Sequence, residues 1–329
     1  MHLLLLLSGD FEFYRIKGKY YDTEAIQQFL VKALKVPMPA TVDSAAIAGM
    51  MDLLRTQGSF ALSARFAVCF EMGGTSRDVK PMDPSVVYPG PIHYDDIGKV
   101  FEKALDEMVV NNDIKSLEEI SSSPELREEL SNKVKSDFVE LASSKHLSGP
   151  TKAALNALTN FVSLDVEEGD LGQFCQATVK SFFDNDLLHT MRIFLENAKG
   201  SFGLCVTTSM DAHRQAVFAA KGQTLSVAFY PRKGVICYGS EQAAVKAGLN
   251  YDTPQGGKTD YKYVDENAVR LDLDDLGGEI VLLDWVSLDF VTSIFCTITT
   301  YLLYKFNYLT GICWRYLSSS FTAKSWLSC

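Results

Sequence analysis

The sequence predicts an α+β protein, with helices in roughly its first two thirds and antiparallel strands after them. Between residues 23 and 198, apolar residues recur mostly at the three- and four-residue spacing of amphipathic helices. After Gly200 the pattern changes to short β-type runs that are separated by polar turns. Because helices and strands are segregated along the chain, the order favours an α+β fold over alternating βαβ units.

Length and composition are those of a globular protein. A chain of 329 residues predicts about two domains. With 47% hydrophobic and 22% charged residues, the sequence is neither disordered throughout, collagen-like nor a polytopic membrane protein. Its 31 basic residues against 41 acidic ones give a net charge of −10, and no local basic patch stands out. We therefore expect no nucleic-acid partner, because an acidic chain repels phosphate backbones.

Cysteine and histidine spacing predicts no metal centre. The seven cysteines are an odd number, lie far apart and include no C-x-x-C pair. This argues against a disulfide framework and a zinc site and favours a reducing compartment, which we take to be the cytoplasm. His189 and His213 have no cysteine or histidine partner at ligand spacing. We expect no cofactor.

The helical region is expected to be acidic and to contain seven helices. Asp22 or Thr23 can cap the first of them. The segment 60–72 is apolar without a clear period, and 73–91 reads as a proline-containing loop. The predicted helices span residues 23–35, 43–57, 94–111, 125–143, 151–161, 171–183 and 184–198.

The β-rich region is expected to hold strands at 201–209, 215–220, 224–230, 234–239 and 279–285, and a helix at 240–249. The leucine run 3–7 is too short for a signal peptide and favours a short buried strand or helix. We divide the chain into a mainly helical acidic region (1–165), a β-meander with helices (166–285) and an apolar tail (286–329). Segments 58–62 and 200–204 share a Gly-Ser-Phe-x-Leu pattern, which we interpret as coincidence.

The apolar tail has several interpretations. Residues 290–304 carry no charge but are fewer than the ~20 needed to span a bilayer. Their β-branched content favours a strand, and membrane contact through 290–304 is the weaker alternative. The rest of the tail is a tail anchor, a loosely packed tail, or sequence that does not belong to the fold.

Residues 197–249 carry a resemblance to a known family. A Gly-Ser-Phe-Gly-Leu strand leads to Ala-Ala-Lys-Gly-Gln-Thr-Leu at 219–225, and a further strand ends in Gly-Ser-Glu at 239–241. This order resembles the second half of the glutaminase domain of class II glutamine amidotransferases, in pattern nearest to glutamine–fructose-6-phosphate aminotransferases. The resemblance implies a partial four-layer αββα sandwich of the N-terminal-nucleophile type, with a large helical insertion. It also implies transferase chemistry of amino-sugar metabolism, in which glutamine hydrolysis delivers ammonia to a sugar phosphate or another acceptor.

The same resemblance implies four substrate-binding residues. Asp170 corresponds to the aspartate that binds the α-amino group of glutamine, since a carboxylate pairs with an ammonium. The alternative for Asp170 is a helix N-cap. Gly222, Gln223 and Thr224 are expected to shape the site.

Catalytic residues of the family are missing from this sequence. The family's nucleophile is an N-terminal cysteine, whereas no cysteine precedes Cys69, and no Asn-Gly pair is present for the oxyanion hole. Cys69, Cys205 and Cys237 lie in apolar runs and are expected to be core residues. Two explanations remain: the chain is a fragment of a longer protein whose other domains are its partners, or it is a pseudoenzyme. A different alternative is a non-catalytic interaction or regulatory module, with the acidic helices of 94–143 as its contact surface.

Overall fold

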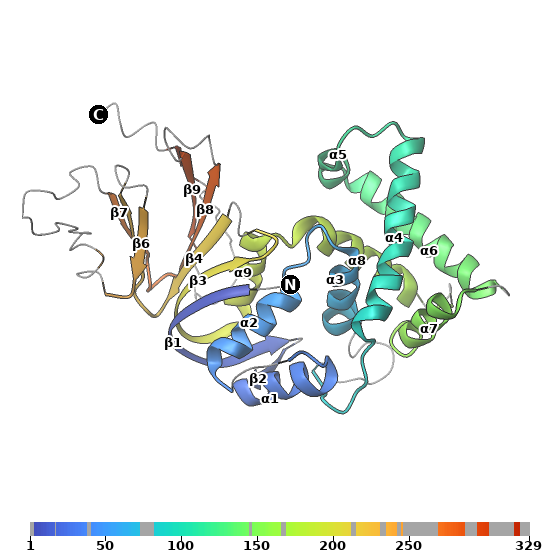
Figure 1. The fold of residues 1–329 in the computed structure, drawn as a ribbon, viewed down its shortest axis with the longest axis horizontal. Helices are drawn as coiled ribbons and strands as arrows, with labels where there is room; N and C mark the ends of the chain where they lie inside the picture. The colour runs from blue at the N-terminus through green and yellow to red at the C-terminus, as the bar shows by residue number, and fades with distance from the viewer. Residues whose placement is uncertain are drawn as a thin grey trace, which may run out of the picture. The chain divides into compact units, whose positions relative to one another are not determined.

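The chain forms two compact units in the computed structural model (Figure 1). The sheet unit comprises Met1–Phe11 and Lys199–Cys329, and the helical unit comprises Glu12–Ala198. These units divide the chain after residues 11 and 198, whereas the sequence suggested divisions after 165 and 285. The structure describes residues 3–16, 18–37, 41–72, 82–144, 147–165, 169–211, 215–230, 235–241, 245, 269–286, 295–302 and 319–322.

The helical unit contains most of the predicted helices, with ends shifted by a few residues. Asp22 caps the first helix, as expected, because its carboxylate accepts a hydrogen bond from the Ala25 N–H at 2.8 Å. A short edge strand, β2, and a short helix, α5, were not predicted. The described elements are β2 (Lys19–Asp22), α1 (Thr23–Gln28), π-helix η1 (Phe29–Ala33), α2 (Asp43–Leu54), α3 (Phe60–Phe66), π-helix η2 (Ala67–Met72), α4 (Pro91–Asn111), α5 (Leu117–Ser122), α6 (Pro124–Ser143), α7 (Gly149–Leu158), α8 (Asp170–Asp184) and α9 (Leu187–Asn197).

The structure corrects the interpretation of segment 60–72, which the sequence alone did not assign to any secondary-structure element. The segment forms helix α3 and the π-helix η2. Ser59 caps α3, accepting a hydrogen bond from the Leu62 N–H at 3.4 Å. Helix α3 packs against α4 and α8, with the Phe60 ring stacked on Phe182. A helix that is covered on several sides is apolar all round, which hides its period in the sequence. Segment 58–62 therefore begins a helix, whereas 200–204 lies in a strand, so their shared pattern carries no shared structure.

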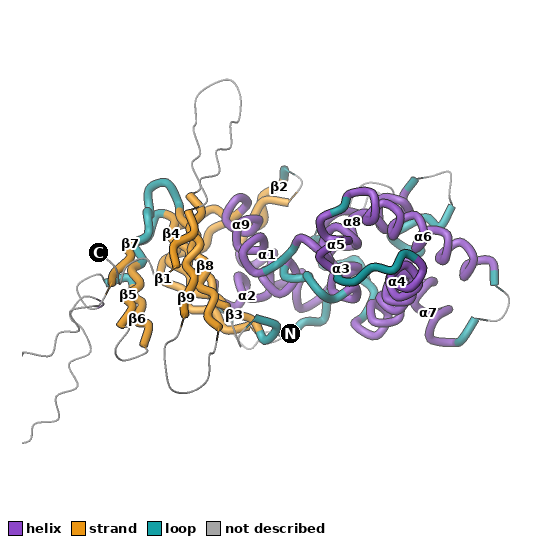
Figure 2. The backbone as a smooth tube through the Cα atoms, turned by 90° about the horizontal axis from the view of Figure 1, so that it is seen from above, coloured by secondary structure: helices purple, strands orange, loops and turns teal. Residues whose placement is uncertain are grey.

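The strands of the sheet unit belong to two sheets (Figure 2). In the described residues the larger sheet has the order β10-β9-β8-β4-β3-β1-β2, where β1 continues into the helical unit to pair with β2. The smaller sheet has the order β6-β5-β7, with antiparallel pairing throughout. The predicted strands are present, and β7 is an additional one. The bounds are β1 (Leu3–Ile16), β3 (Ala198–Thr208), β4 (Gln215–Lys221), β5 (Ser226–Tyr230), β6 (Val235–Gly239), β7 (Val269–Asp272), β8 (Glu279–Val286), β9 (Phe295–Leu302) and β10 (Ser319–Thr322).

An apolar core joins the two sheets face to face. Successive side chains of a strand point to opposite faces, so every second residue of β4 contributes to this layer. On the outer face of the smaller sheet, Val245 packs against Ala228 and Cys237. Buried members of the core between the sheets are Ala216, Phe218 and Ala220 of β4, Val281 and Leu283 of β8, Val227 of β5, and Leu225 and Leu273 beside them.

The predicted tail contributes strands to the larger sheet. Strand β9 pairs antiparallel with β8 from Glu279↔Leu302 to Val286↔Phe295, and β10 pairs with β9. The strand expected within 290–304 is thus confirmed for 295–302, and the other residues of that prediction lie outside the described ones. Across the described ranges, no helix is long and apolar enough to cross a membrane. Of the helix predicted at 240–249, the structure describes 240, 241 and 245, with the Val245 N–H donating to the Glu241 carbonyl at 3.2 Å.

Candidate binding site where the chain crosses between the sheets

Three segments that carry the family resemblance meet where the chain passes from β4 to β5. The Ser201 hydroxyl donates a hydrogen bond to the Gly222 carbonyl at 2.6 Å, and Phe202 forms a β-bridge with Gly222. The Thr224 hydroxyl donates to the Ser240 carbonyl at 3.0 Å. Segments 200–204, 221–225 and 239–241, which are separate in sequence, are therefore direct neighbours. We call residues 222–224 the crossing turn.

Gly222 is required by the geometry of the crossing turn. Its φ angle of +69° lies in the left-handed region, which side chains other than glycine rarely adopt. A Cβ at this position would lie 3.2 Å from the Ser201 hydroxyl oxygen, closer than an ordinary contact. The Gly222 N–H donates to the Asp275 carbonyl at 2.6 Å. The turn is thus fixed by β3 on one side and by the β7–β8 connection on another.

Three of the four predicted binding residues are consecutive in sequence and form the crossing turn, whereas Asp170 lies elsewhere in the chain. Gly222 is exposed, and Gln223 and Thr224 are half-buried, so the crossing turn is accessible from solvent. Asp170 belongs to the helical unit, where it is the first residue of α8. The N-cap of α8 is Gly169, not Asp170, and Oδ2 of Asp170 is buried without a hydrogen-bond partner in the described part of the chain.

A polar trio beside the crossing turn was not foreseen. The Ser226 hydroxyl donates to Asp272 Oδ1 at 2.6 Å, and the Arg270 guanidinium pairs with Asp272 Oδ2 at 2.6 Å. Ser226 also lies opposite Gly239 in the register of β5 and β6. These residues share the outer face of the smaller sheet with Ala228. Their proximity depends on β7, which the polar sequence around 269–272 did not reveal.

Three of the described cysteines, Cys69, Cys175 and Cys205, are not activated nucleophiles. Burial raises the pKa of the Cys69 thiol to about 12 and that of Cys205 to about 11. Burial also raises the pKa of Cys175. Because the thiolate is the reactive form, these side chains are inert thiols at neutral pH, as expected for core residues.

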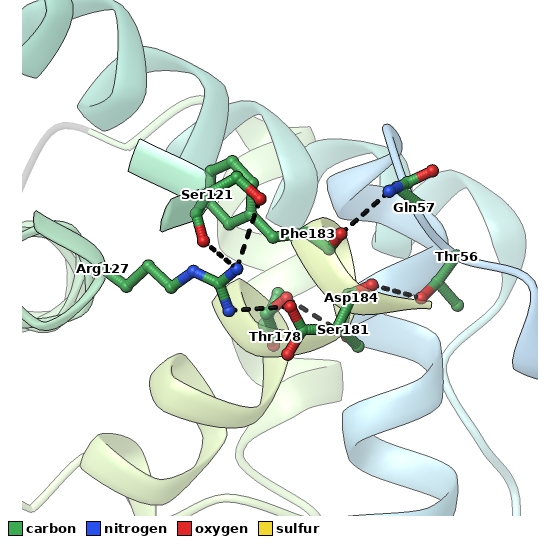
Figure 3. Close-up of polar contacts among 8 residues, drawn as sticks. All are labelled: Thr56, Gln57, Ser121, Arg127, Thr178, Ser181, Phe183 and Asp184. Atoms are coloured by element: carbon green, nitrogen blue, oxygen red, sulfur yellow. Dashed lines mark hydrogen bonds and ion pairs between the residues drawn. The ribbon is translucent and has the colours of Figure 1, made fainter. Parts of the chain in front are cut away.

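The helical unit contains a polar cluster of its own, centred on Arg127 (Figure 3). The Arg127 guanidinium pairs with Asp184 Oδ1 at 2.7 Å, donates to the Ser121 carbonyl and lies 5.1 Å from the centre of the Phe183 ring. Next to it, the loop after α2 closes the end of α8: the Thr56 hydroxyl and the Gln57 amide donate to carbonyls of that helix at 2.9 Å. These contacts tie α5, α6 and α8 together, so the cluster is a structural clamp, although Nε of Arg127 has no hydrogen-bond partner in the described part of the chain. We call it the Arg127 clamp.

Comparisons with known proteins found no match: no family model, no curated protein and no solved structure matches the chain. Within the described ranges, no group of three or more histidine, cysteine, aspartate or glutamate residues is placed to hold a metal ion. The amidotransferase resemblance of residues 197–249 therefore remains a prediction, and the crossing turn is the candidate site that it singles out.

Proposed function

We propose that the sheet unit is a class II glutamine-amidotransferase-like domain that binds glutamine at the crossing turn. Its fold would be a partial four-layer αββα sandwich of the N-terminal-nucleophile type. The chain as given would not hydrolyse glutamine. In a longer protein that supplied an N-terminal cysteine, the same scaffold would release ammonia for a sugar phosphate or another acceptor.

One observation carries this proposal: the three family segments converge at a turn that connects two sheets packed face to face. The Ser201–Gly222 and Thr224–Ser240 hydrogen bonds join these segments. Nothing in their separate patterns requires them to be neighbours. The apolar core between β4 and β5 agrees with the two central sheets of the proposed sandwich. The packing of Val245 on the outer face of the smaller sheet agrees with a helical layer on that face.

The chemistry of the crossing turn suits a carboxamide ligand. Gln223 carries a side-chain amide that both donates and accepts hydrogen bonds, which complements the side-chain amide of glutamine. The backbone at Gly222 has no side chain to obstruct approach. The role of Asp170 is a separate prediction, in which its carboxylate would pair with the α-ammonium group of glutamine.

Thermal unfolding with and without glutamine tests the proposal. A ligand that binds only the folded state raises Tm as its concentration exceeds Kd. We expect L-glutamine to raise Tm more than D-glutamine or L-asparagine does, and we expect no release of glutamate. Equal Tm shifts with all three amino acids, or no shift, would refute a specific glutamine site. Release of glutamate would refute the inference that this chain lacks a catalytic nucleophile.

A non-catalytic interaction module is the second candidate. The acidic first turns of α5 and α6 present exposed carboxylates at Glu118, Glu119 and Glu125. Val110 is 79% exposed at the end of α4. This alternative predicts that glutamine leaves Tm unchanged, and that replacing the three glutamates with glutamine abolishes capture of a basic partner.

A further inference from the structure

The two hydroxyl groups at the crossing turn can act only as acceptors toward a ligand. The Ser201 hydroxyl donates its proton to the Gly222 carbonyl at 2.6 Å. The Thr224 hydroxyl likewise donates its proton to the Ser240 carbonyl at 3.0 Å. A carbonyl oxygen cannot donate, so the direction of both hydrogen bonds is fixed. Because a hydroxyl has one proton and two lone pairs, both oxygens keep acceptor capacity alone.

The backbone N–H of Gly222 is not available to a ligand either. It already donates to the Asp275 carbonyl at 2.6 Å. Gly222 is exposed, and Ser201 and Thr224 are half-buried, so a ligand can approach the turn from solvent. A ligand group that meets the two hydroxyl oxygens must therefore bring its own N–H or O–H, since a hydrogen bond needs one donor.

The side chain of Gln223 lies over β3, near Ser201. A Cβ at Gly203 would lie 3.7 Å from Cγ of Gln223. Ser201 and Gly203 are two residues apart in this strand, so they share a face and lie about 7 Å from each other. The Gln223 amide can donate to a carbonyl oxygen. A donor and nearby acceptors are the partners that a carboxamide, with its carbonyl and its NH2 group, requires.

We propose that Ser201 and Thr224 make the crossing turn selective for the carboxamide of glutamine over the carboxylate of glutamate, a role that rests on the proposed function. The carboxamide NH2 would donate to these two oxygens, and its carbonyl would accept from Gln223. A carboxylate has no proton at neutral pH, so glutamate would bring acceptors to acceptors. In a longer protein that hydrolysed glutamine, the same selectivity would favour release of the glutamate product.

Isothermal titration calorimetry of the full chain with three ligands tests this selectivity. L-Glutamate γ-methyl ester keeps the side-chain carbonyl of glutamine and its lack of charge, but it has no side-chain N–H group. We expect the ester to bind about tenfold more weakly than L-glutamine, and L-glutamate at least as weakly as the ester, because the two acceptors are left without a donor. Binding of the ester or of glutamate as tight as that of glutamine would overturn the proposal.

Ser201→Ala separates recognition of the ligand from support of the turn. The variant loses the acceptor and also the hydrogen bond to the Gly222 carbonyl. A purely structural role would weaken glutamine and the ester alike and leave the ratio of their affinities at about tenfold. We expect the ratio to fall to about threefold, because only the Thr224 oxygen remains. An unchanged ratio would overturn the proposal, and if the variant does not fold, the three ligands with the unmodified chain decide it.

Thr207→Val is the matched control for Ser201→Ala. Thr207 lies in the same strand, and its hydroxyl also donates to a carbonyl, that of Gln215, at 2.8 Å. This variant should keep the tenfold preference for glutamine, and loss of the preference would contradict the assignment to Ser201. Failure of the unmodified chain to bind glutamine would refute the proposed function and this inference together, whereas an unchanged ratio in Ser201→Ala refutes the inference alone.

Discussion

Two helical glycines differ at the residue scale in what a side chain would meet. A Cβ at Gly98 of α4 would lie 2.9 Å from the Ala61 backbone nitrogen, a distance that real Cβ atoms essentially never show. A Cβ at Gly172 of α8 would meet only the flexible end of Lys135, at 3.9 Å. Helix propensity alone favours alanine at both positions by up to about 1 kcal/mol.

Gly98→Ala should therefore destabilise the protein, and Gly172→Ala should not. We expect Gly98→Ala to lose about 1–3 kcal/mol, because overpacking forces α3 and α4 apart. Urea unfolding measures both effects. A stable Gly98→Ala would mean that these helices do not pack closely, whereas Gly172→Ala controls for the change in propensity.

The raised pKa of Glu279 predicts how the stability of the protein depends on pH. Its side chain is buried, and this burial raises its pKa. The hydrogen bond from the Asp274 N–H at 2.7 Å lowers the pKa by a smaller amount, and repulsion from the Asp274 carboxylate raises it slightly. A carboxyl group with a raised folded-state pKa contributes stability while protonated at low pH. That contribution is lost as pH rises from its ordinary value of 4.5 through the raised folded value.

Glu279→Gln tests this dependence, because glutamine cannot ionise and its amide oxygen can still accept from Asp274. Relative to the unmodified chain, the variant should gain stability as pH rises above 4.5, and the difference should become constant once the pH exceeds the raised folded-state pKa. Urea unfolding at several pH values measures it. A difference that does not change with pH would show that Glu279 titrates alike in both states.

Some residues could be placed from sequence alone and some could not. Asp22 was predictable as a cap, because capping depends on a local pattern of side chain and following N–H groups. The partner of Asp272 was not, because Ser226 is distant in sequence and joins it only through strand pairing. The alternative of Asp170 as a helix N-cap is wrong, because the N-cap of α8 is Gly169 in the left-handed conformation, and Asp170 is the first residue of the helix.

The Arg127 clamp connects separate helices at the element scale. Arg127 from α6 joins the Ser121 carbonyl of α5 to Asp184 of α8. Replacing it leaves Asp184 and the carbonyl without their donor in a partly buried setting. Arg127→Met should therefore cost about 1–3 kcal/mol, the range for hydrogen bonds to charged groups and for partners left unsatisfied.

Lys99→Met provides the matched control, since Lys99 forms an exposed pair with Asp96 on a single helix. Exposed pairs are screened by solvent, so no measurable loss of stability is expected from that variant. Thermal and urea unfolding of both variants distinguish the clamp from an ordinary surface pair. If Arg127→Met were as stable as Lys99→Met, the clamp would have no structural role.

Elements with a clear amphipathic period were predictable, and elements defined by tertiary contacts were not. Helices α4 and α6 follow their predicted ranges closely, because each has one buried and one exposed face. Helix α3 was missed because several neighbours cover it. Strand β7 was missed because its four residues include Arg270 and Asp272, whose charges pair with each other.

The sheet unit is the part of the whole molecule in which segments that are distant in sequence become neighbours at the crossing turn. Sequence order predicted the strands, but the assignment of β4 and β5 to different sheets follows from packing between faces. The crossing turn lies where the chain changes sheets, and Ser201 and Phe202 of β3 contact it there. The contacts show that the three segments which carry the resemblance, 200–204, 221–225 and 239–241, are neighbours.

The most direct test of glutamine binding at the crossing turn compares two threonine variants. Thr224→Val removes the hydrogen bond to the Ser240 carbonyl within the turn. Thr207→Val removes an equivalent bond, 2.8 Å to the Gln215 carbonyl, elsewhere in the same unit. Both should lose about 0.5–1.5 kcal/mol of stability.

Thermal unfolding of both variants with and without L-glutamine is the decisive measurement. We predict that glutamine raises Tm of Thr207→Val as much as that of the unmodified chain, and that Thr224→Val loses most of this response. Equal responses from both variants, or none from the unmodified chain, would contradict glutamine binding at the crossing turn.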